Sequence, residues 1–257
     1  RDAEGYTFMG WSTKPMQSVS PQYEAEEKIT VNGNVDLYAV VFNRTTETDL
    51  TEDQLPQVDI YKYKQVIFVG DSRTEFMENV LTGMGESATK NVKFVCSAGK
   101  GLDWFTTTGW AQLYSIVQHD SNSILSKKTA VIFNFGVNDL SKSADYAEYY
   151  NWIAPQLKSK GCELYFMSVN PVNRLMLPNA GRADRSEAAV RSFNQYMKAN
   201  LSSAYTYIDM YSYLKSTGYS FASDHYGTGT VDDGLHYTTR TYKRIFAKCM
   251  DSLRVPA

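Results

Sequence analysis

The stretch Val66-Ile67-Phe68-Val69-Gly70-Asp71-Ser72 joins a short apolar run to a polar turn, and a helix-like segment follows from Arg73 to Leu81. An apolar run of this length bounded by a turn is typical of a buried strand. Similar runs recur at 92–95, 130–133, 164–167 and 205–208. Amphipathic segments with helix caps lie at 144–160, 184–201 and 239–253. This alternation predicts an α/β fold, a three-layer αβα sandwich built on a five-stranded parallel sheet.

The length and composition agree with a folded chain of one large domain, or of one domain and a fraction. The 257 residues are 43% hydrophobic and 21% charged, which excludes an intrinsically disordered protein. The formal net charge is only −2, so bulk electrostatics favours neither nucleic acid nor an anionic membrane as partner. No apolar run approaches the roughly 20 residues that a membrane span needs. We therefore expect no nucleic-acid partner and no membrane span.

Residues 1–43 have a different pattern, in which apolar and polar side chains alternate around glycines. The runs Tyr6–Trp11, Ile29–Val31 and Leu37–Phe42 predict strands, and Asn32-Gly33-Asn34 predicts a hairpin turn between the last two. Residues 44–60 are rich in threonine and acidic residues, which predicts a linker. The predicted division is thus a β-rich module at 1–43, a linker at 44–60 and a main domain at 61–257.

The first of these segments resembles a known module. The pattern from Gly5 to Ser12, followed by Ile29–Val31 and Leu37–Ala39, is similar to the Listeria-Bacteroides repeat, a small β-rich module of bacterial surface proteins. An ordinary hairpin appendage is the alternative. Because the chain opens on Arg1 inside a patterned segment, we expect a longer precursor with a signal peptide. The resemblance implies a secreted or cell-surface bacterial protein, attached through this module.

The three cysteines, Cys96, Cys162 and Cys249, are odd in number and lack metal-ligand spacing. We interpret them as small core hydrophobes, which leaves the redox compartment undecided. No metal-ligand cluster is evident either, so we expect neither metal nor cofactor, and no effect of chelators.

Polar residues follow three of the predicted strands, where ligands bind in a parallel sheet. Ser72 follows the first strand at the start of a helix, and Ser97-Ala98-Gly99-Lys100-Gly101 follows the second. Gly136-Val137-Asn138-Asp139 follows the third, and Asn138 could donate a hydrogen bond to an oxyanion. Each signal taken alone also fits a simple cap or turn.

A histidine motif lies near the C-terminus, in Asp232-Asp233-Gly234-Leu235-His236. A carboxylate three residues before a histidine can orient the imidazole and leave its other nitrogen free to act as a base. His119 and His225 have no comparable partner, and we interpret them as structural.

The order Ser, Gly, Asn and Asp-x-x-His resembles the SGNH hydrolases, or GDSL esterases and lipases, over about 66–253. This resemblance implies a flavodoxin-like fold with Ser72 as nucleophile, His236 as general base and Asp233 as its orienting acid. It also implies an oxyanion hole made by the backbone N–H groups of Ser72 and Gly99 and the side chain of Asn138. Two points stay open, because Gly101 could replace Gly99 and Asp232 could rival Asp233. Activity should rise with pH through the histidine pKa, ordinarily about 6.5.

The substrate is less well indicated. Aromatic rings beside amides and an arginine at the expected rim suit a sugar better than a long acyl chain. The rim should include Phe105, Val172, Asn173 and Tyr226, and the candidate substrate-binding residues are Arg73, Gly101, Trp104, Asn170, Arg174 and Tyr237. We therefore expect a monomeric esterase that removes a small acyl group, acetyl, from a glycan or small-molecule ester. An O-acyltransferase of cell-surface glycan and a non-catalytic adhesion module are the alternatives. A flavodoxin-like nucleotide binder is disfavoured, because no phosphate-loop pattern appears and Asp71 would repel phosphate.

Overall fold

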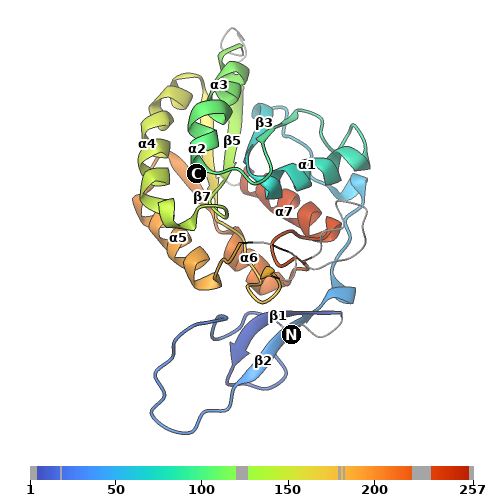
Figure 1. Ribbon diagram of the computed structural model, residues 1–257. Helices are drawn as coiled ribbons and strands as arrows, with labels where there is room; N and C mark the ends of the chain where they lie inside the picture. Colours follow the sequence, from blue (N-terminus) through green and yellow to red (C-terminus); the bar gives the residue numbers. More distant parts are fainter. Residues whose placement is uncertain are drawn as a thin grey trace.

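A central parallel sheet organises the main domain. The computed structural model describes residues 5–17, 19–119, 127–178, 181, 183–221 and 233–254, apart from the His119 side chain. The five strands lie in the order β4-β3-β5-β6-β7. Figure 1 labels β3, β5 and β7 of this sheet. Neighbouring strands are all parallel. Their bounds are Tyr63–Gly70 for β3, Val92–Cys96 for β4, Lys128–Asn134 for β5, Cys162–Met167 for β6 and Tyr205–Ile208 for β7. Each strand contains one of the predicted apolar runs, so the predicted sheet is confirmed.

Helices cover both faces of this sheet. One face packs against α3 (Trp110–His119), α4 (Ser143–Ser159) and α5 (Glu187–Asn200). The other face packs against α1 (Ser72–Met84), α6 (Met210–Thr217) and α7 (Thr239–Ser252). Successive side chains of a strand point to opposite faces. Accordingly, Ile67 and Val69 enter the first core, whereas Val66 and Phe68 enter the second. The predicted three-layer sandwich is confirmed.

Local capping explains where the helices begin and end. The helix predicted from 184 begins only at Glu187, because the Ser186 hydroxyl accepts the Ala189 N–H at 3.0 Å and so acts as its N-cap. Gly161 follows α4 with a positive φ of 76°, as a residue that ends a helix often does. Sequence patterns did not reveal α6, nor the helical segment formed by α2 (Leu102–Trp104), a π-helical turn (Phe105–Gly109) and α3.

The N-terminal module is a two-stranded antiparallel sheet. β1 (Tyr6–Ser12) pairs with β2 (Tyr38–Asn43), and Figure 1 shows both strands outside the main sheet. The strand predicted at Ile29–Val31 is wrong, because β2 takes β1 as its partner and Val31 remains 51% exposed. The likeness to a Listeria-Bacteroides repeat stays a prediction.

The module and the segment after it pack against the main domain. Met9, Val40 and Phe42 share the apolar core that contains α6 and α7. In the segment predicted as a linker, short helical turns form at Arg44–Thr46 and Glu52–Gln54. Glu47 in this segment is buried, and its carboxylate lies 3.0 Å from the guanidinium of Arg244 on α7. Residues 44–60 are therefore held against the main domain.

Two further predictions concern cysteines and membranes. Cys162 and Cys249 are buried, as expected for small core hydrophobes. Cys96 is only half-buried, and its thiol donates to the Glu78 carboxylate at 3.3 Å. Within the described ranges, no helix combines the length and the apolar character needed to cross a membrane.

Candidate active site

The turn after β3 places Ser72 at the carboxyl edge of the sheet. Gly70 is required here, since a Cβ would come within 2.0 Å of the Thr74 hydroxyl and 2.8 Å of the Asn134 carbonyl oxygen. Asp71 caps α1, because its carboxylate accepts the Arg73 N–H at 3.0 Å. Ser72 is the first residue of α1, where helix N–H groups have no intrahelical partner. The helix N-terminus therefore favours negative charge beside the Ser72 hydroxyl.

Ser72, His236 and Asp233 form a continuous chain of hydrogen bonds. His236 Nε2 lies 2.9 Å from Ser72 Oγ, and His236 Nδ1 lies 2.6 Å from Asp233 Oδ2. The other carboxylate oxygen of Asp233 accepts the backbone N–H groups of Leu235 and His236 at 2.9 and 2.7 Å. Burial opposes ionisation of Asp233, but these hydrogen bonds outweigh it and lower its pKa to about 2. Asp233 is therefore a fixed carboxylate, which orients the imidazole.

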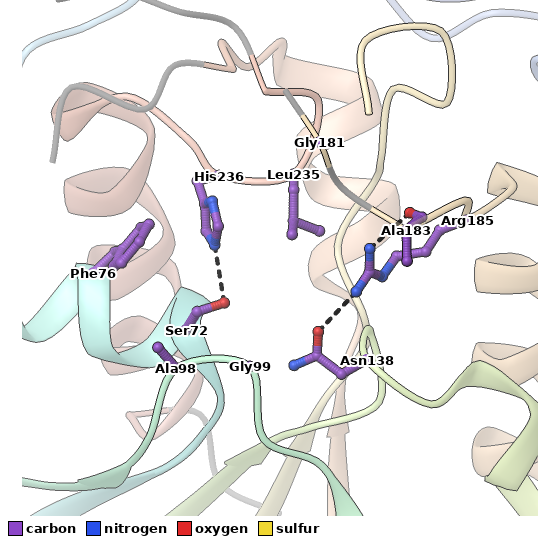
Figure 2. Close-up of a pocket in the computed structure, with 10 residues that line it drawn as sticks. All are labelled: Ser72, Phe76, Ala98, Gly99, Asn138, Gly181, Ala183, Arg185, Leu235 and His236. Carbon is purple, nitrogen blue, oxygen red and sulfur yellow. Dashed lines mark hydrogen bonds between the residues drawn. The ribbon is translucent and has the colours of Figure 1, made fainter. Parts of the chain in front are cut away.

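Ser72 and His236 line a cavity of about 300 Å³, and Figure 2 shows the residues around it. Phe76 lies against the imidazole, with ring centroids 4.1 Å apart. The cavity is lined by Ser72, Phe76, Ala98, Gly99, Asn138, Gly181, Ala183, Arg185, Leu235 and His236. All four sequence blocks of the predicted site thus contribute to one cavity.

The structure distinguishes the two candidate glycines of the second block. Gly99 lines the cavity with a positive φ of 71°. Gly101 lies beside Asp139 instead, where a Cβ would come within 2.3 Å of the carboxylate oxygen. Asp139 accepts the neighbouring Leu102 N–H at 2.9 Å, which fixes the end of this loop. Of the two candidates, Gly99 is therefore the one that lies at the catalytic cavity, and Gly101 is a packing glycine.

Asn138 is held from both ends of its amide. Its Nδ2 donates to the Lys100 carbonyl at 2.8 Å, and its Oδ1 accepts from Arg185 at 3.0 Å (Figure 2). Arg185 also donates to the Val137 carbonyl at 2.6 Å. Because Arg185 binds the amide oxygen, the amide nitrogen is fixed on the cavity side. Sequence reasoning missed Arg185, which lies in the loop before α5, 47 positions away, with no motif around it.

Arg73, predicted to bind substrate, is instead a buried residue that connects two loops through hydrogen bonds. Its guanidinium donates to the backbone carbonyls of Leu235, Asn170 and Pro171 at 2.8–2.9 Å and is 3% exposed. The prediction is wrong because all three guanidinium nitrogens are occupied by the protein. Through Leu235, Arg73 instead holds the loop that carries His236.

Most of the aromatic and amide residues expected at the rim are also buried. Tyr237 is 1% exposed and donates to the Pro171 carbonyl, and Asn170 is 1% exposed. Phe105 is fully buried in the core, and Val172 is 2% exposed. Trp104 is half-buried against Phe135, with ring centroids 6.1 Å apart. None of these lines the catalytic cavity.

Arg174 lies outside the catalytic cavity as well. Its guanidinium binds both carboxylate oxygens of Asp184 at 2.7 Å and reaches Glu26 at 3.1 Å. It lines a neighbouring cavity together with Asn138 and Arg185. Asn173 is half-buried and donates its N–H to the Gly234 carbonyl, so it supports the loop of His236. Tyr226, His225 and the rival acid Asp232 lie outside the described residues.

The chain matches one protein family over most of its length. The match is to the GDSL-like Lipase/Acylhydrolase family and covers residues 66–249. No curated protein matches the chain. Among solved structures, a candidate SGNH hydrolase from Slackia heliotrinireducens superposes with a TM-score of 0.52 at 13% identity. That match covers 75% of this chain and all of the other.

A second similar structure is that of a candidate acylhydrolase from Bacteroides fragilis. Its TM-score is 0.50 at 15% identity, and the match covers 79% of this chain and 92% of the other. At such identities, these structures support the fold alone. The family match, the fold and the meeting of Ser72, Gly99, Asn138 and His236 in one cavity agree. The chain belongs to the GDSL-like lipase and acylhydrolase family, the SGNH hydrolases.

Proposed function

We propose that this chain is a serine esterase that releases a small acyl group, acetyl, from a carbohydrate ester through an acyl-enzyme. The observation that carries the proposal is the continuous hydrogen-bond chain from Ser72 Oγ through His236 to Asp233. It ends in a cavity that also holds Gly99 and Asn138. This arrangement supplies a nucleophile, a base, an orienting acid and oxyanion donors.

The first half of the reaction forms the acyl-enzyme. His236 Nε2 takes the proton from Ser72 Oγ as this oxygen attacks the ester carbonyl carbon. The carbonyl oxygen becomes an oxyanion, to which Ser72 N–H, Gly99 N–H and Asn138 Nδ2 donate. The protonated imidazole then gives its proton to the leaving sugar oxygen, and the bond between this oxygen and the carbonyl carbon breaks. The charged Asp233 stabilises the imidazolium throughout.

The second half restores the enzyme. A water molecule gives a proton to His236 and attacks the acyl carbon. The same three groups again donate hydrogen bonds to the oxyanion. The bond to Ser72 Oγ breaks, His236 returns its proton to this oxygen, and the free acid leaves. The pKa of Asp233, at about 2, keeps this carboxylate charged at any pH at which the imidazole is neutral.

The size and lining of the site support a small acyl group. The cavity has a volume of about 300 Å³, and Leu235 and Phe76 are its only large apolar side chains within the described residues. A long acyl chain needs a continuous apolar groove. The glycine and alanine residues that make up much of the lining leave room for acetyl instead.

The adjoining surface supports a polyhydroxylated alcohol. A second cavity of about 400 Å³ shares Asn138, Ala183 and Arg185 with the catalytic cavity. Its lining adds Asp139, Ser141, Asp184 and Ser186, which are side chains that bind hydroxyl groups. The alcohol portion of an ester bound at Ser72 has this polar surface next to it.

An ester panel tests the proposal. Wild type and Ser72→Ala are compared on acetylated mono- and oligosaccharides, p-nitrophenyl acetate and p-nitrophenyl esters of longer acids. We expect acetate release from the sugars, little activity on the long esters, and a loss of at least about 10⁴-fold in Ser72→Ala. Faster cleavage of long-chain esters than of acetates would contradict the small-acyl assignment. Transfer of acetyl to an added glycan, in place of free acetate, would reassign the chain as an acyltransferase.

A further inference from the structure

We propose that the N-terminal module completes the substrate site by binding sugar units distant from the ester, with Trp11 as the stacking ring. This inference rests on the proposed function, since it assumes a glycan ester at Ser72. It assigns the module a part in substrate recognition in addition to the surface attachment expected from its sequence.

A third cavity lies where the module meets the main domain. It has a volume of about 220 Å³ and is lined from the module by Phe8, Trp11, Ala25 and Glu26. From the main domain it is lined by residues 172–175 and by Glu187. Neither part of the chain forms this cavity alone.

The third cavity is a neighbour of the cavities near Ser72. The catalytic cavity and the second cavity share Asn138, Ala183 and Arg185 as walls. The second and third cavities share Arg174, which lies between them and binds Asp184 and Glu26. An extended chain that reaches from one cavity to the next fits this arrangement better than a compact small molecule does.

The third cavity has the chemistry of a sugar site. Trp11 is 38% exposed and packs edge-on against Phe8, with ring centroids 5.2 Å apart. An aromatic ring offers the apolar face on which a sugar ring stacks, while its neighbours bind the hydroxyl groups. The carboxylate of Glu26 and the guanidinium of Arg174 supply these polar groups at the same cavity.

Buried ion pairs fix the module in the position that this site needs. Lys215 on α6 lies 2.8 Å from Glu24 of the module and 3.0 Å from Glu187, and its side chain is 5% exposed. The same ammonium group donates to the Met9 carbonyl in β1. The third cavity is thus held in shape before substrate arrives, which lowers the entropic cost of binding.

The test uses the full chain and two acetylated xylo-oligosaccharides, one of two and one of six sugar units. The readout is kcat/KM for the hexamer divided by kcat/KM for the dimer, with p-nitrophenyl acetate as a measure of the catalytic centre. We expect the wild type to prefer the hexamer and Trp11→Ala to lower the ratio about tenfold through KM, the effect of losing one aromatic stacking contact. Trp11→Phe should retain most of the preference.

Two further variants keep the test informative. Trp152→Ala is the matched control, because Trp152 is 59% exposed on α4 and lines none of the three cavities. It should behave as wild type. Leu175→Ala changes a residue of the third cavity that is 68% exposed, so it cannot perturb the core. We expect it to lower the ratio about two- to threefold, as loss of a small apolar contact does.

Failure of the inference differs from failure of the proposed function. Equal wild-type efficiency on dimer and hexamer overturns the inference while acetyl esterase activity stands. An unchanged hexamer-to-dimer ratio in both Trp11→Ala and Leu175→Ala also overturns the inference. So does a loss of kcat/KM in these variants that is as large on p-nitrophenyl acetate as on the hexamer. A wild-type chain that hydrolyses none of these esters overturns the proposed function itself.

Discussion

The carboxyl edge of the sheet and the N-terminal module both depend on buried cations, but they use them differently. At the edge, Arg73 donates to three backbone carbonyls and so fixes the loops around Ser72 and His236. At the module, Lys215 pairs with the carboxylates of Glu24 and Glu187 and fixes one part of the chain against another. The first arrangement sets the positions of reacting atoms, and the second sets the position of a whole surface. Chemistry and placement are therefore separable by mutation.

The catalytic triad gives the largest effect on chemistry short of removing the nucleophile. Asp233→Asn should lower kcat by about 10³–10⁴, because the neutral amide neither fixes the imidazole tautomer nor stabilises the imidazolium. Asp209→Asn, which changes the N-cap of α6 at the same edge, is the matched control and should keep near wild-type activity. Steady-state kinetics on p-nitrophenyl acetate measure both. A loss below tenfold in Asp233→Asn would mean that another group orients His236.

The pH dependence of the rate distinguishes the ionisation of Asp233 from that of His236. The lowered pKa of Asp233, about 2, keeps its carboxylate charged from mildly acidic pH upward. The rise of kcat/KM between about pH 5 and 8 should then reflect the imidazole and Asp71, whose pKa burial raises to about 6, and not Asp233. Since the folded-state pKa of Asp233 lies below its ordinary value, the stability that it contributes is present above about pH 4 and is lost as the pH falls toward 2. A rate profile that stays flat down to about pH 4 and falls only below it would contradict this assignment.

The oxyanion side of the cavity gives the next largest effect. Asn138→Ala should lower kcat by about 10²–10³ with little change in KM, because its amide donates mainly in the transition state. Asn200→Ala, an exposed asparagine that donates to the Tyr196 carbonyl, is the control. An effect confined to KM would show that Asn138 binds the ground state of the substrate instead.

Short sequence patterns made the catalytic residues at the carboxyl edge of the sheet predictable. The blocks of Ser72, Gly99 and Asn138 each follow a strand, and parallel strands bring their carboxyl ends together whatever the sequence between them. Gly70 and the Asp71 cap fix the turn at Ser72, and the three-residue offset places Asp233 beside His236. The meeting of Ser72, Gly99 and Asn138 therefore follows from sheet topology, and the contact between Asp233 and His236 follows from their spacing.

Contacts between distant parts of the chain were not predictable in the same way. Arg73 next to Ser72 looked like a substrate ligand, but its partners are carbonyls about a hundred or more residues away. Glu47 looked like part of a linker, but Arg244 on α7 binds it in the interior. The strand expected at Ile29–Val31 had the correct alternation, but β2 paired with β1. Side-chain type gives the chemistry of such residues, and only the packing of the whole chain gives their partners.

Within the catalytic cavity, Arg185 is the clearest example of a residue whose partner could not be predicted from the sequence. Arg185→Met should lower kcat about tenfold, because Asn138 would lose the partner of its Oδ1 while keeping the Lys100 contact. In the double variant with Asn138→Ala the two losses should not add, because Arg185 acts through Asn138. Arg240→Met, at a half-exposed arginine on α7, is the control. Full additivity in the double variant would show that Arg185 contacts substrate directly.

The ion pairs of the module should give the smallest effect on chemistry and a large one on stability. Lys215→Met leaves Glu24 and Glu187 without their cation in a buried site, which should cost roughly 3 kcal/mol and lower the melting temperature by about 6–12 °C. Because Lys215 contacts none of the reacting groups, kcat on p-nitrophenyl acetate at 20 °C should stay within about twofold of wild type. The matched control is Lys128→Met, which breaks the half-exposed pair with Glu163 and should cost less than about 1 kcal/mol. Calorimetry gives the melting temperatures, and kinetics on p-nitrophenyl acetate with the same samples give kcat. If Lys215→Met lowered kcat as strongly as Arg185→Met while its melting temperature stayed unchanged, the module would take part in the chemistry, and the separation between the two regions would fail.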